Sequence, residues 1–322
     1  MENLFGAWRE FVRGRKNKND VAEFSLNLSK NIFCLHEDLR TKTYRHGPYK
    51  HFKIADPKPR NIHKATVRDR LLHHAIYRIL YPYFDKKFIH DSYSCRNFKG
   101  THRAINRFRD FGRKVSRNNS RTCWVLKCDV RKFFASIDHE VLLRILAKQI
   151  CDRDTLGLLE RVIESFQTES PIYAMAEIKK GLPLGNLTSQ LWVNIYMNEF
   201  DQFVKHKLKV KYYIRYADDF VVLDSDKGKL ETMLRYIVLF LRERLKLELH
   251  PDKVSIKTLV SGVDFLGWVN FPDHRVLRTA TKRRMFKKSV LSDKPETRQS
   301  YLGLLGHGNT WKLRKFLAGI AT

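Results

Sequence analysis

The segment YYIRYADDFVVLD, residues 212 to 224, restricts the possible folds of this chain more than any other stretch. Its tyrosines, isoleucine, phenylalanine and valines are typical of a strand that packs on a core. Yet two adjacent carboxylates, Asp218 and Asp219, stand at its centre, and burying an uncompensated carboxylate is costly. Either a tight turn lifts both side chains to a surface, or a cation neutralises them where they stand.

A third carboxylate ends another apolar segment. The residues CWVLKCDV, 123 to 130, predict a short strand that ends at Asp129. If this strand lies beside the hairpin of residues 212–224, three carboxylates meet at one edge of a sheet. Such a group suits hard divalent cations such as magnesium, which take oxygen ligands. Two ions about 3.5 to 4 Å apart would activate a hydroxyl and stabilise a departing pyrophosphate, which is polymerase chemistry. The alternative is a solvated β-turn, in which Asp is common.

The net charge indicates a polyanionic partner. The chain holds 62 Lys and Arg against 34 Asp and Glu, a formal net charge of +28, and such a field steers nucleic acid toward the surface. Two separated basic tracts, residues 96–132 and 275–322, suit a long duplex better than a small ligand. A generally basic, soluble surface is the alternative. An anionic membrane is disfavoured, because no lysine-rich amphipathic helix with a bulky apolar face stands out.

Composition disfavours several other classes of protein. No run of eighteen apolar residues occurs, and the N-terminus lacks the apolar run of a signal peptide, so we expect a cytoplasmic protein without membrane contact. The five cysteines include no CxxC pair and support neither a disulfide framework nor a structural zinc site. We expect all five to be buried thiols.

The apolar periodicity predicts an alternation of helices and strands. We expect strands at 123–130, in a hairpin over 212–224, and near 253–258 and 263–270. Helices are expected at 20–40, at 66–84, from about 138, from 187, at 226–247 and in the basic C-terminus. This order predicts an α+β architecture, not regular βαβ winding.

Several blocks of sequence follow one another in a known order. KCDVRKFF, GLPLGNLTSQ, YADD and VDFLGW resemble, in turn, the first catalytic motif, the nucleotide-pocket motif, the metal-binding box and the primer-grip hairpin of the reverse transcriptases. KPRNIHKATVRDR and SYSCRNFKGTHRAI are similar to the fingers motifs of the bacterial group-II-like branch of that family. Four ordered blocks are a far more specific signal than any single one.

The resemblance implies a right-hand polymerase and its activity. An N-terminal extension and the fingers would span residues 1–122, and a palm with an antiparallel sheet would span 123–271. A helical segment at about 139–180 within the palm would contribute to the fingers, and a helical thumb would take residues 272–322. The implied activity is that of an RNA-directed DNA polymerase, which uses two Mg²⁺ ions, dNTPs and an RNA template.

The resemblance also implies roles for individual residues. Asp129, Asp218 and Asp219 would be the catalytic metal ligands. Phe134, five positions after Asp129, would be the steric gate whose ring clashes with a 2′-hydroxyl; core packing is the alternative, and the neighbouring Phe133 would serve that purpose. These positions belong to the first catalytic motif and the metal-binding box.

Three further residues would contact the nucleotide or the leaving group. Arg60 would hold the triphosphate, a bidentate task suited to a guanidinium. Arg70, like Arg68, is a weaker candidate, because Asp69 between them offers pairing within the same helix. Lys253 stands where the family's candidate proton donor to pyrophosphate falls, with a solvated lysine as the alternative.

The nucleotide-pocket motif narrows the resemblance to one subfamily. Most reverse transcriptases carry a glutamine directly before the motif's glycine and a proline after its serine, whereas here Leu184 precedes Gly185 and Gln190 follows Ser189. This departure resembles the reverse transcriptases of diversity-generating retroelements, which copy a template-repeat RNA into cDNA with errors opposite adenine, in mutagenic retrohoming.

That subfamily implies a host and a partner. The gene would be bacterial, archaeal or carried by a phage, and a basic, oligomeric accessory variability protein would hold enzyme and RNA together. Small antiphage or other group-II-like reverse transcriptases are the nearest alternative. A catalytically silent RNA-binding scaffold on the same fold is a more distant one, because it has no physical need to retain the three acids with Phe134 and Arg60.

Overall fold

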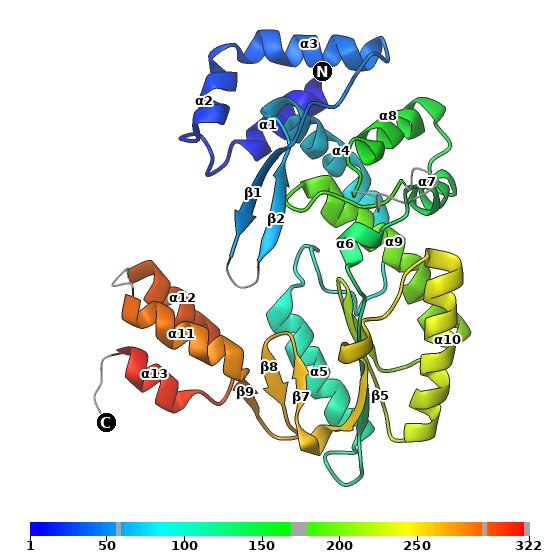
Figure 1. Cartoon of the computed structure of the whole chain (residues 1–322), viewed down its shortest axis with the longest axis vertical. Coiled ribbons are helices and arrows are strands. Elements are labelled where there is room, and N and C mark those ends of the chain that lie inside the picture. The colour runs from blue at the N-terminus through cyan, green and yellow to red at the C-terminus, as the bar shows by residue number, and fades with distance from the viewer. Residues whose placement is uncertain (56–58, 169–178, 292–294, 319–322) are drawn as a thin grey trace, which may run out of the picture. The chain divides into compact units, whose positions relative to one another are not determined.

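The computed structural model of the chain describes residues 1–322 except 56–58, 169–178, 292–294 and 319–322 (Figure 1). The chain forms two compact units that alternate along the sequence. The first unit comprises Met1–His90, Val130–Phe203 and Val238–Glu248, and the second comprises Asp91–Asp129, Val204–Ile237 and Leu249–Thr322. The contiguous division into residues 1–122, 123–271 and 272–322 stays a prediction.

The first unit is mainly helical. Its helices are α1 (Glu2–Phe11), α2 (Asn19–Leu26), α3 (Leu28–Arg40), α4 (Val67–Asp85), α6 (Phe133–Ser136), α7 (His139–Ala147), α8 (Arg153–Glu164) and α9 (Leu187–Gln202). β1 (Lys50–Ile54) and β2 (Arg60–Lys64) form an antiparallel hairpin between α3 and α4. Helix α10 (Lys227–Leu245) contributes to both units, and a π-helical turn, η1 (Phe203–Lys207), follows α9.

Most of the predicted helices in this unit are confirmed, with one break. The helix expected at 20–40 is two helices, because Asn27 leaves the helical region with φ −119° and ψ 38°. α4 matches the helix expected at 66–84, and its start is set by Thr66, whose side chain accepts a hydrogen bond from the Asp69 N–H. α7 starts at an equivalent cap, where the side chain of Asp138 accepts from the Val141 N–H.

A four-stranded antiparallel sheet is central to the second unit. The strands lie in the order β4-β5-β3-β6, and their bounds are Tyr213–Tyr216, Asp219–Asp224, Trp124–Asp129 and Ser255–Thr258. Helix α5 (Thr101–Val115) packs on this sheet, where Ile105, Phe108 and Phe111 share one core with Val125 and Val221. The strand expected at 123–130 and the hairpin expected over 212–224 are therefore confirmed.

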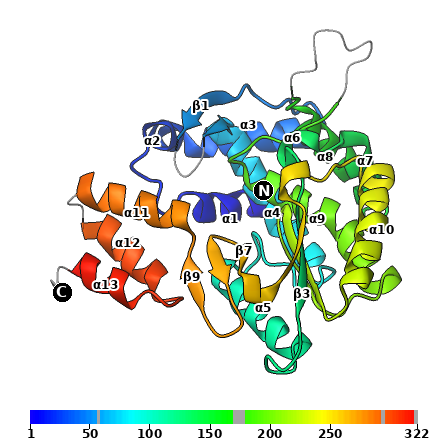
Figure 2. The ribbon, with the colours of Figure 1, turned by 60° about the horizontal axis from the view of Figure 1, so that its bottom comes forward.

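The rest of the second unit is a small sheet followed by three helices. β7 (Val263–Phe265), β8 (Trp268–Asn270) and β9 (Arg275–Leu277) pair in that order. The segment 263–270, read from periodicity as a strand, is the hairpin that the resemblance of VDFLGW implied, because Leu266 and Gly267 adopt positive φ angles and reverse the chain. The helices α11 (Thr279–Leu291), α12 (Pro295–Leu305) and α13 (Trp311–Ala318) lie side by side in both views (Figures 1 and 2).

The loop between α12 and α13 is fixed to the small sheet. A Cβ atom at Gly308 would lie 2.1 Å from the Cζ3 atom of the buried Trp268 ring, so only glycine allows this approach of the backbone. The Asn309 N–H donates to the Arg275 carbonyl at 2.9 Å, and the Arg275 guanidinium donates to the His307 carbonyl. These contacts tie the C-terminal helices to β8 and β9.

Three of the five cysteines are exposed. Cys123 and Cys128 are buried, but Cys34, Cys95 and Cys151 are exposed, so the expectation of five buried thiols is wrong. Cys95 lies in a turn and Cys151 in a loop, while Cys34 lies on α3 away from the buried Ile32 and Leu35. In the part of the chain that the structure describes, no helix is both long and apolar enough to cross a membrane.

Candidate active site

The turn between β4 and β5 carries the paired carboxylates. Ala217 opens the turn with φ 54°, a left-handed conformation that is uncommon outside glycine. Asp218 follows it, and Asp219 begins β5. The guanidinium of Arg215, which is fully buried, donates from Nη1 to the Ala217 carbonyl at 3.1 Å. A buried arginine therefore holds the turn in its uncommon conformation.

Asp129 lies beside this turn, on the neighbouring strand. β3 pairs with β5 so that Asp129 and Asp219 are direct cross-strand partners. Side chains of directly opposed residues lie on the same face of an antiparallel pair, with Cβ atoms about 4.5 to 5.5 Å apart. The backbone carbonyl of Asp129 accepts a hydrogen bond from the His250 N–H at 2.8 Å. The fold thus brings the three predicted carboxylates to one edge of the sheet.

The surroundings of these carboxylates disfavour their charged forms. Burial, followed by the negative charges of Asp219 and Asp129, raises the pKa of Asp218 to about 6. Burial also raises the pKa of Asp219, although the nearby positive charge of Lys127 acts in the opposite direction. The Oδ1 atom of Asp219 is buried and has no hydrogen-bond partner in the structure. A buried carboxylate oxygen without a partner suits a hard cation.

Lys253 contacts the third carboxylate directly. Its Nζ lies 2.7 Å from Oδ1 of Asp129, so it is an ion-paired residue and not simply a solvated lysine. Among the described residues, no three His, Cys, Asp or Glu side chains are grouped so that they could hold a metal ion. The three carboxylates therefore share one edge of the sheet but do not form the predicted three-carboxylate metal cluster in the described structure. The oxygen donors and the unpartnered Asp219 atom nevertheless fit a divalent cation.

Phe134 lies in α6 of the first unit. The preceding residue, Phe133, packs in the core as predicted. Phe133 is buried, whereas Phe134 is only partly buried, and the two rings meet edge to face with centroids 5.7 Å apart. The backbone carbonyl of Phe134 accepts from the Leu182 N–H at 2.8 Å. This bond joins the helix of the predicted gate to the start of the nucleotide-pocket motif.

The nucleotide-pocket motif is fixed to strand β2. The Leu184 carbonyl accepts from the His63 N–H at 3.0 Å, and Asn186 donates from Nδ2 to the His63 carbonyl at 2.8 Å. Gly185 between them has φ 104°, and a Cβ atom there would lie 2.9 Å from the Ile62 side chain. Glycine is required at this position for both reasons. Gln190, one turn into α9, is exposed.

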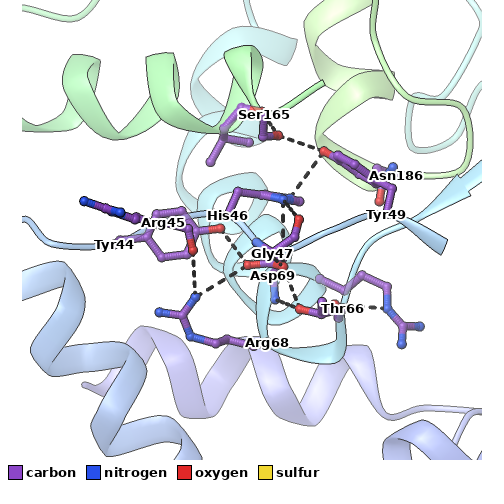
Figure 3. A network of polar contacts seen from close by, with 12 residues as sticks. Tyr44, Arg45, His46, Gly47, Tyr49, Thr66, Arg68, Asp69, Ser165 and Asn186 are labelled. Atoms are coloured by element: carbon purple, nitrogen blue, oxygen red, sulfur yellow. Dashed lines mark hydrogen bonds and ion pairs between the residues drawn. The ribbon is translucent and has the colours of Figure 1, made fainter. Parts of the chain in front are cut away.

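The base of the β1–β2 hairpin is held by one buried carboxylate, Asp69 of α4 (Figure 3). Before β1, Asp69 accepts from the Tyr44 hydroxyl at 2.8 Å and from the Gly47 N–H at 3.1 Å. After β2, it accepts from the Thr66 hydroxyl at 2.6 Å. Both ends of the hairpin are thereby tied to α4. This network positions the strand on which Arg60 lies.

The two arginines predicted to bind the triphosphate have different environments. Arg60 is exposed on β2. Arg70 is mostly buried, donates to the carboxylate of Asp20 and stacks over the Phe11 ring at 5.1 Å. The expected pairing of the RDR segment with Asp69 is made by Arg68 and not by Arg70. A substrate role for Arg70 stays a prediction, and it requires this side chain to leave Asp20.

Asp69→Asn should destabilise the protein by about 1 to 3 kcal/mol. An amide has only one acceptor oxygen, and its NH₂ group would face a donor, so at least one buried donor of the network loses its partner. Urea unfolding followed by circular dichroism measures the change. Asp38→Asn is the matched control, because Asp38 is a more exposed partner of Arg68 and its loss should cost less than about 1 kcal/mol. Equal stability of the Asp69→Asn variant and the wild type would mean that the network is dispensable.

Sequence reasoning missed two supporting residues. Arg215 holds the carboxylate turn, and Asp69 holds the hairpin. A signal for Arg215 existed, because a lone arginine in the otherwise apolar segment YYIRYADDFVVLD must be either exposed or paired. Asp69 gave no such signal, since acidic residues are common in the first turn of a helix.

The predicted residues are divided between the two units. Asp129, Asp218, Asp219 and Lys253 belong to the second unit. Arg60, Arg70, Phe134 and the pocket residues Leu184, Gly185 and Gln190 belong to the first. Each group is therefore positioned by the core of its own unit.

Comparison with known protein families gives a match over most of the chain. The family described as "Reverse transcriptase (RNA-dependent DNA polymerase)" matches residues 53–270. Protein YkfC of Escherichia coli is 25% identical, over 89% of this chain and 81% of its own length. The group II intron-encoded protein LtrA of Lactococcus lactis is 23% identical over 78% of this chain, which spans about half of LtrA, 51% of its length.

Comparison with solved structures shows a shared fold. The telomerase of Candida tropicalis, in complex with a TWJ fragment of telomeric RNA, matches with a TM-score of 0.53 at 11% sequence identity. The match covers 83% of this chain and 51% of the telomerase chain. The apo telomerase from the same organism matches with a TM-score of 0.52 over 72% of this chain and 49% of its own. At this level of identity the likeness concerns the fold alone.

Proposed function

Because the chain belongs to the reverse transcriptase (RNA-dependent DNA polymerase) family and has the α+β fold of a right-hand polymerase, we propose that it copies an RNA template into DNA with Asp129, Asp218 and Asp219 as its catalytic residues. One observation carries this assignment: Asp129 and Asp219 oppose each other across β3 and β5, with Asp218 in the adjoining turn. Three carboxylates at one partly buried edge cost stability, so a protein that only binds RNA has no use for them.

The three carboxylates would hold two Mg²⁺ ions through their oxygens. When bound, the ions activate the attacking 3′-hydroxyl and neutralise the charge that develops on the leaving pyrophosphate. The unpartnered Oδ1 atom of Asp219 and the pKa of Asp218, which burial raises, support this role, because a bound cation would give the first a partner and stabilise the charge of the second. Lys253, which contacts Asp129, donates a proton to the departing pyrophosphate.

Phe134 and Arg60 are the proposed nucleotide contacts of the reaction. Phe134 lies under the incoming sugar and excludes a 2′-hydroxyl, which is consistent with its partial exposure beside the buried Phe133. Arg60 binds the triphosphate from the exposed face of β2. The hydrogen bonds between His63 and the loop of Leu184 and Asn186 support both assignments, because they fix β2 to the pocket motif.

Primer extension tests the proposed activity. The purified chain, given an RNA template, a DNA primer, dNTPs and Mg²⁺, should make cDNA, and a chelator should stop synthesis. Asp226→Asn, which removes one exposed carboxylate shortly after β5, should leave synthesis unchanged. RNA binding without extension, under conditions in which a known reverse transcriptase extends the same primer, would favour an RNA-binding scaffold.

We further propose that the enzyme diversifies sequences by copying a template-repeat RNA with errors opposite adenine. The supporting observation is Leu184, whose backbone is fixed by His63 but whose side chain can make no hydrogen bond to a base or sugar. A basic, oligomeric accessory protein and the structured RNA are the proposed partners. The alternative is another group-II-like reverse transcriptase, such as an antiphage enzyme, with ordinary fidelity.

Leu184→Gln should lower misincorporation opposite template adenine by severalfold to tenfold. A glutamine amide can hydrogen-bond in the pocket, one such bond is worth on the order of 1 kcal/mol, and discrimination changes tenfold for each 1.4 kcal/mol. Sequencing of cDNA made from one defined RNA measures the effect, and errors opposite the other three bases serve as the internal control. An unchanged adenine error rate with intact polymerisation would place the infidelity elsewhere, or favour an enzyme that is not mutagenic.

A further inference from the structure

We infer that Lys253 is an internal counter-ion that competes with divalent cations for Asp129. The inference rests on the proposed function, in which Asp129 is a metal ligand. The Nζ atom of Lys253 lies 2.7 Å from Oδ1 of Asp129, and the side chains are 40% and 12% exposed. This distance is that of a charge-assisted hydrogen bond, and the carboxylate end of the pair is largely shielded from water.

The backbone around Lys253 fixes the position of this pair. Lys253 ends a short 3₁₀ turn, η2 (Pro251–Lys253), in which its N–H donates to the His250 carbonyl at 3.0 Å. The His250 N–H in turn donates to the carbonyl of Asp129 at 2.8 Å. Strand β6, which follows, is paired with β3. The turn that carries Lys253 is therefore hydrogen-bonded, through His250, to the backbone of Asp129. This backbone link holds the side chains of Lys253 and Asp129 close to each other.

The charges around the pair explain why a counter-ion is needed. Asp218 and Asp219 lie close enough to Asp129 for its charge to raise the pKa of each, while Lys253 lowers both. Lys127 and Arg278 also act on Asp219. Among the described residues, the ammonium of Lys253 is the positive group that contacts Asp129 directly. Without a metal ion, Lys253 thus compensates part of the negative charge at this edge of the sheet.

A carboxylate has lone pairs for more than one partner, but an ammonium group and a divalent cation on the same carboxylate repel each other. A metal ion that binds Asp129 therefore competes with Lys253 and weakens or displaces its contact. This competition lowers the affinity of the site for the metal and frees the ammonium group at the moment when the metal is in place. Once the metal is bound, the ammonium group of Lys253 can reach the departing pyrophosphate. The proposed proton donation by Lys253 is thereby linked to metal binding.

Equilibrium binding of Mn²⁺, measured by calorimetry without nucleic acid, tests this competition. Lys253→Gln should bind Mn²⁺ about tenfold more tightly than the wild type, since the metal no longer has to break a charge-assisted hydrogen bond. Lys253→Arg retains the positive charge and should tighten binding less than Lys253→Gln does. Lys257→Gln is the matched control: it removes the same charge from an exposed position on β6 and should change the affinity by less than about twofold, because exposed charges are screened by salt.

Thermal unfolding gives a second readout. Without metal, Lys253→Gln should unfold at a lower temperature than the wild type, and saturating Mg²⁺ should raise its midpoint by more. Unchanged or weaker Mn²⁺ binding by Lys253→Gln, or equal tightening by Lys257→Gln, would overturn the inference. Neither measurement requires nucleotidyl transfer, so a failure of primer extension by the wild type would contradict the proposed function and leave this test intact.

Discussion

Asp218→Asn should abolish DNA synthesis while the chain stays folded and still binds RNA through its basic residues. The substitution keeps the shape of the side chain but removes its charge, which a metal ligand at this site requires. Metal ions contribute several kcal/mol to such a step, so the loss of one ligand should slow nucleotidyl transfer about a thousandfold or more. Single-turnover addition of one nucleotide measures the rate, and Asp219→Asn should behave in the same way. Wild-type rates in either variant would contradict the three-carboxylate assignment.

The same substitution should stabilise the metal-free protein at pH 8. Burial raises the pKa of Asp218 from 3.8 to about 6, so its ionisation opposes folding. The stability that protonated Asp218 provides is fully present below pH 4 and is lost as the pH rises through about 6. Asp218→Asn avoids this loss, and its unfolding midpoint in a chelator should exceed that of the wild type at pH 8 but not at pH 4.

Two controls separate this effect from a general change in charge. Asp226→Asn removes an exposed carboxylate but keeps an oxygen that can accept from the Lys229 N–H, so the midpoint should change little at either pH. The affinity of the metal-free wild type for Mg²⁺ should also fall as the pH drops below about 6, because a proton on Asp218 competes with the metal. A lower midpoint for Asp218→Asn at pH 8 would show that the carboxylate is already compensated in the metal-free protein.

Phe134→Ala should allow the enzyme to incorporate ribonucleotides. In the proposed pocket the ring clashes with a 2′-hydroxyl, and overpacking of this kind costs about 1 to 3 kcal/mol. Removing the ring should therefore reduce the preference for dNTPs over ribonucleotides by roughly ten- to a hundredfold. The ratio of kcat/KM for dATP and ATP, on the same template and primer, measures this preference.

The neighbouring phenylalanine provides the matched control. Phe133 is buried in the core of the first unit, so Phe133→Leu should lower stability by less than about 1.5 kcal/mol without changing the choice of sugar. If Phe134→Ala lowers stability and leaves the dNTP preference unchanged, Phe134 is a packing residue and not the gate.

Much of the fold could be predicted because its signals are local. The strand before Asp129 and the hairpin around Asp218 follow from short runs of β-branched and aromatic residues, and both are present. The helices from Leu187 and over 227–245 follow from apolar spacing. The errors of periodicity arose where one backbone conformation overrides a pattern. Asn27 divides the helix predicted over 20–40, and Leu266 with Gly267 reverses the chain within 263–270, where the resemblance of VDFLGW to a hairpin, and not its periodicity, gave the right structure.

The site could be predicted only in part. The sequence places Asp129 at the end of one strand and Asp218 with Asp219 in a turn, and these strands do pair. It gave no reason to expect that Asp129 pairs with Lys253, that Arg70 pairs with Asp20, or that Asp69 collects donors from both ends of a hairpin. The partners in these contacts are separated by up to 124 positions in the chain.

The sequence by itself determined the α+β class and the placement of Asp129 at the end of a strand and of Asp218 with Asp219 at a hairpin turn, because backbone preference and side-chain chemistry are properties of short segments. Only the tertiary structure decided the partner of each charged group. The energy of an ion pair or a buried hydrogen bond depends on the distance between its atoms and on their shielding from water. Both are set by the packing of segments that are far apart in the chain, as at Asp129, where the turn before β6 brings Lys253 to 2.7 Å.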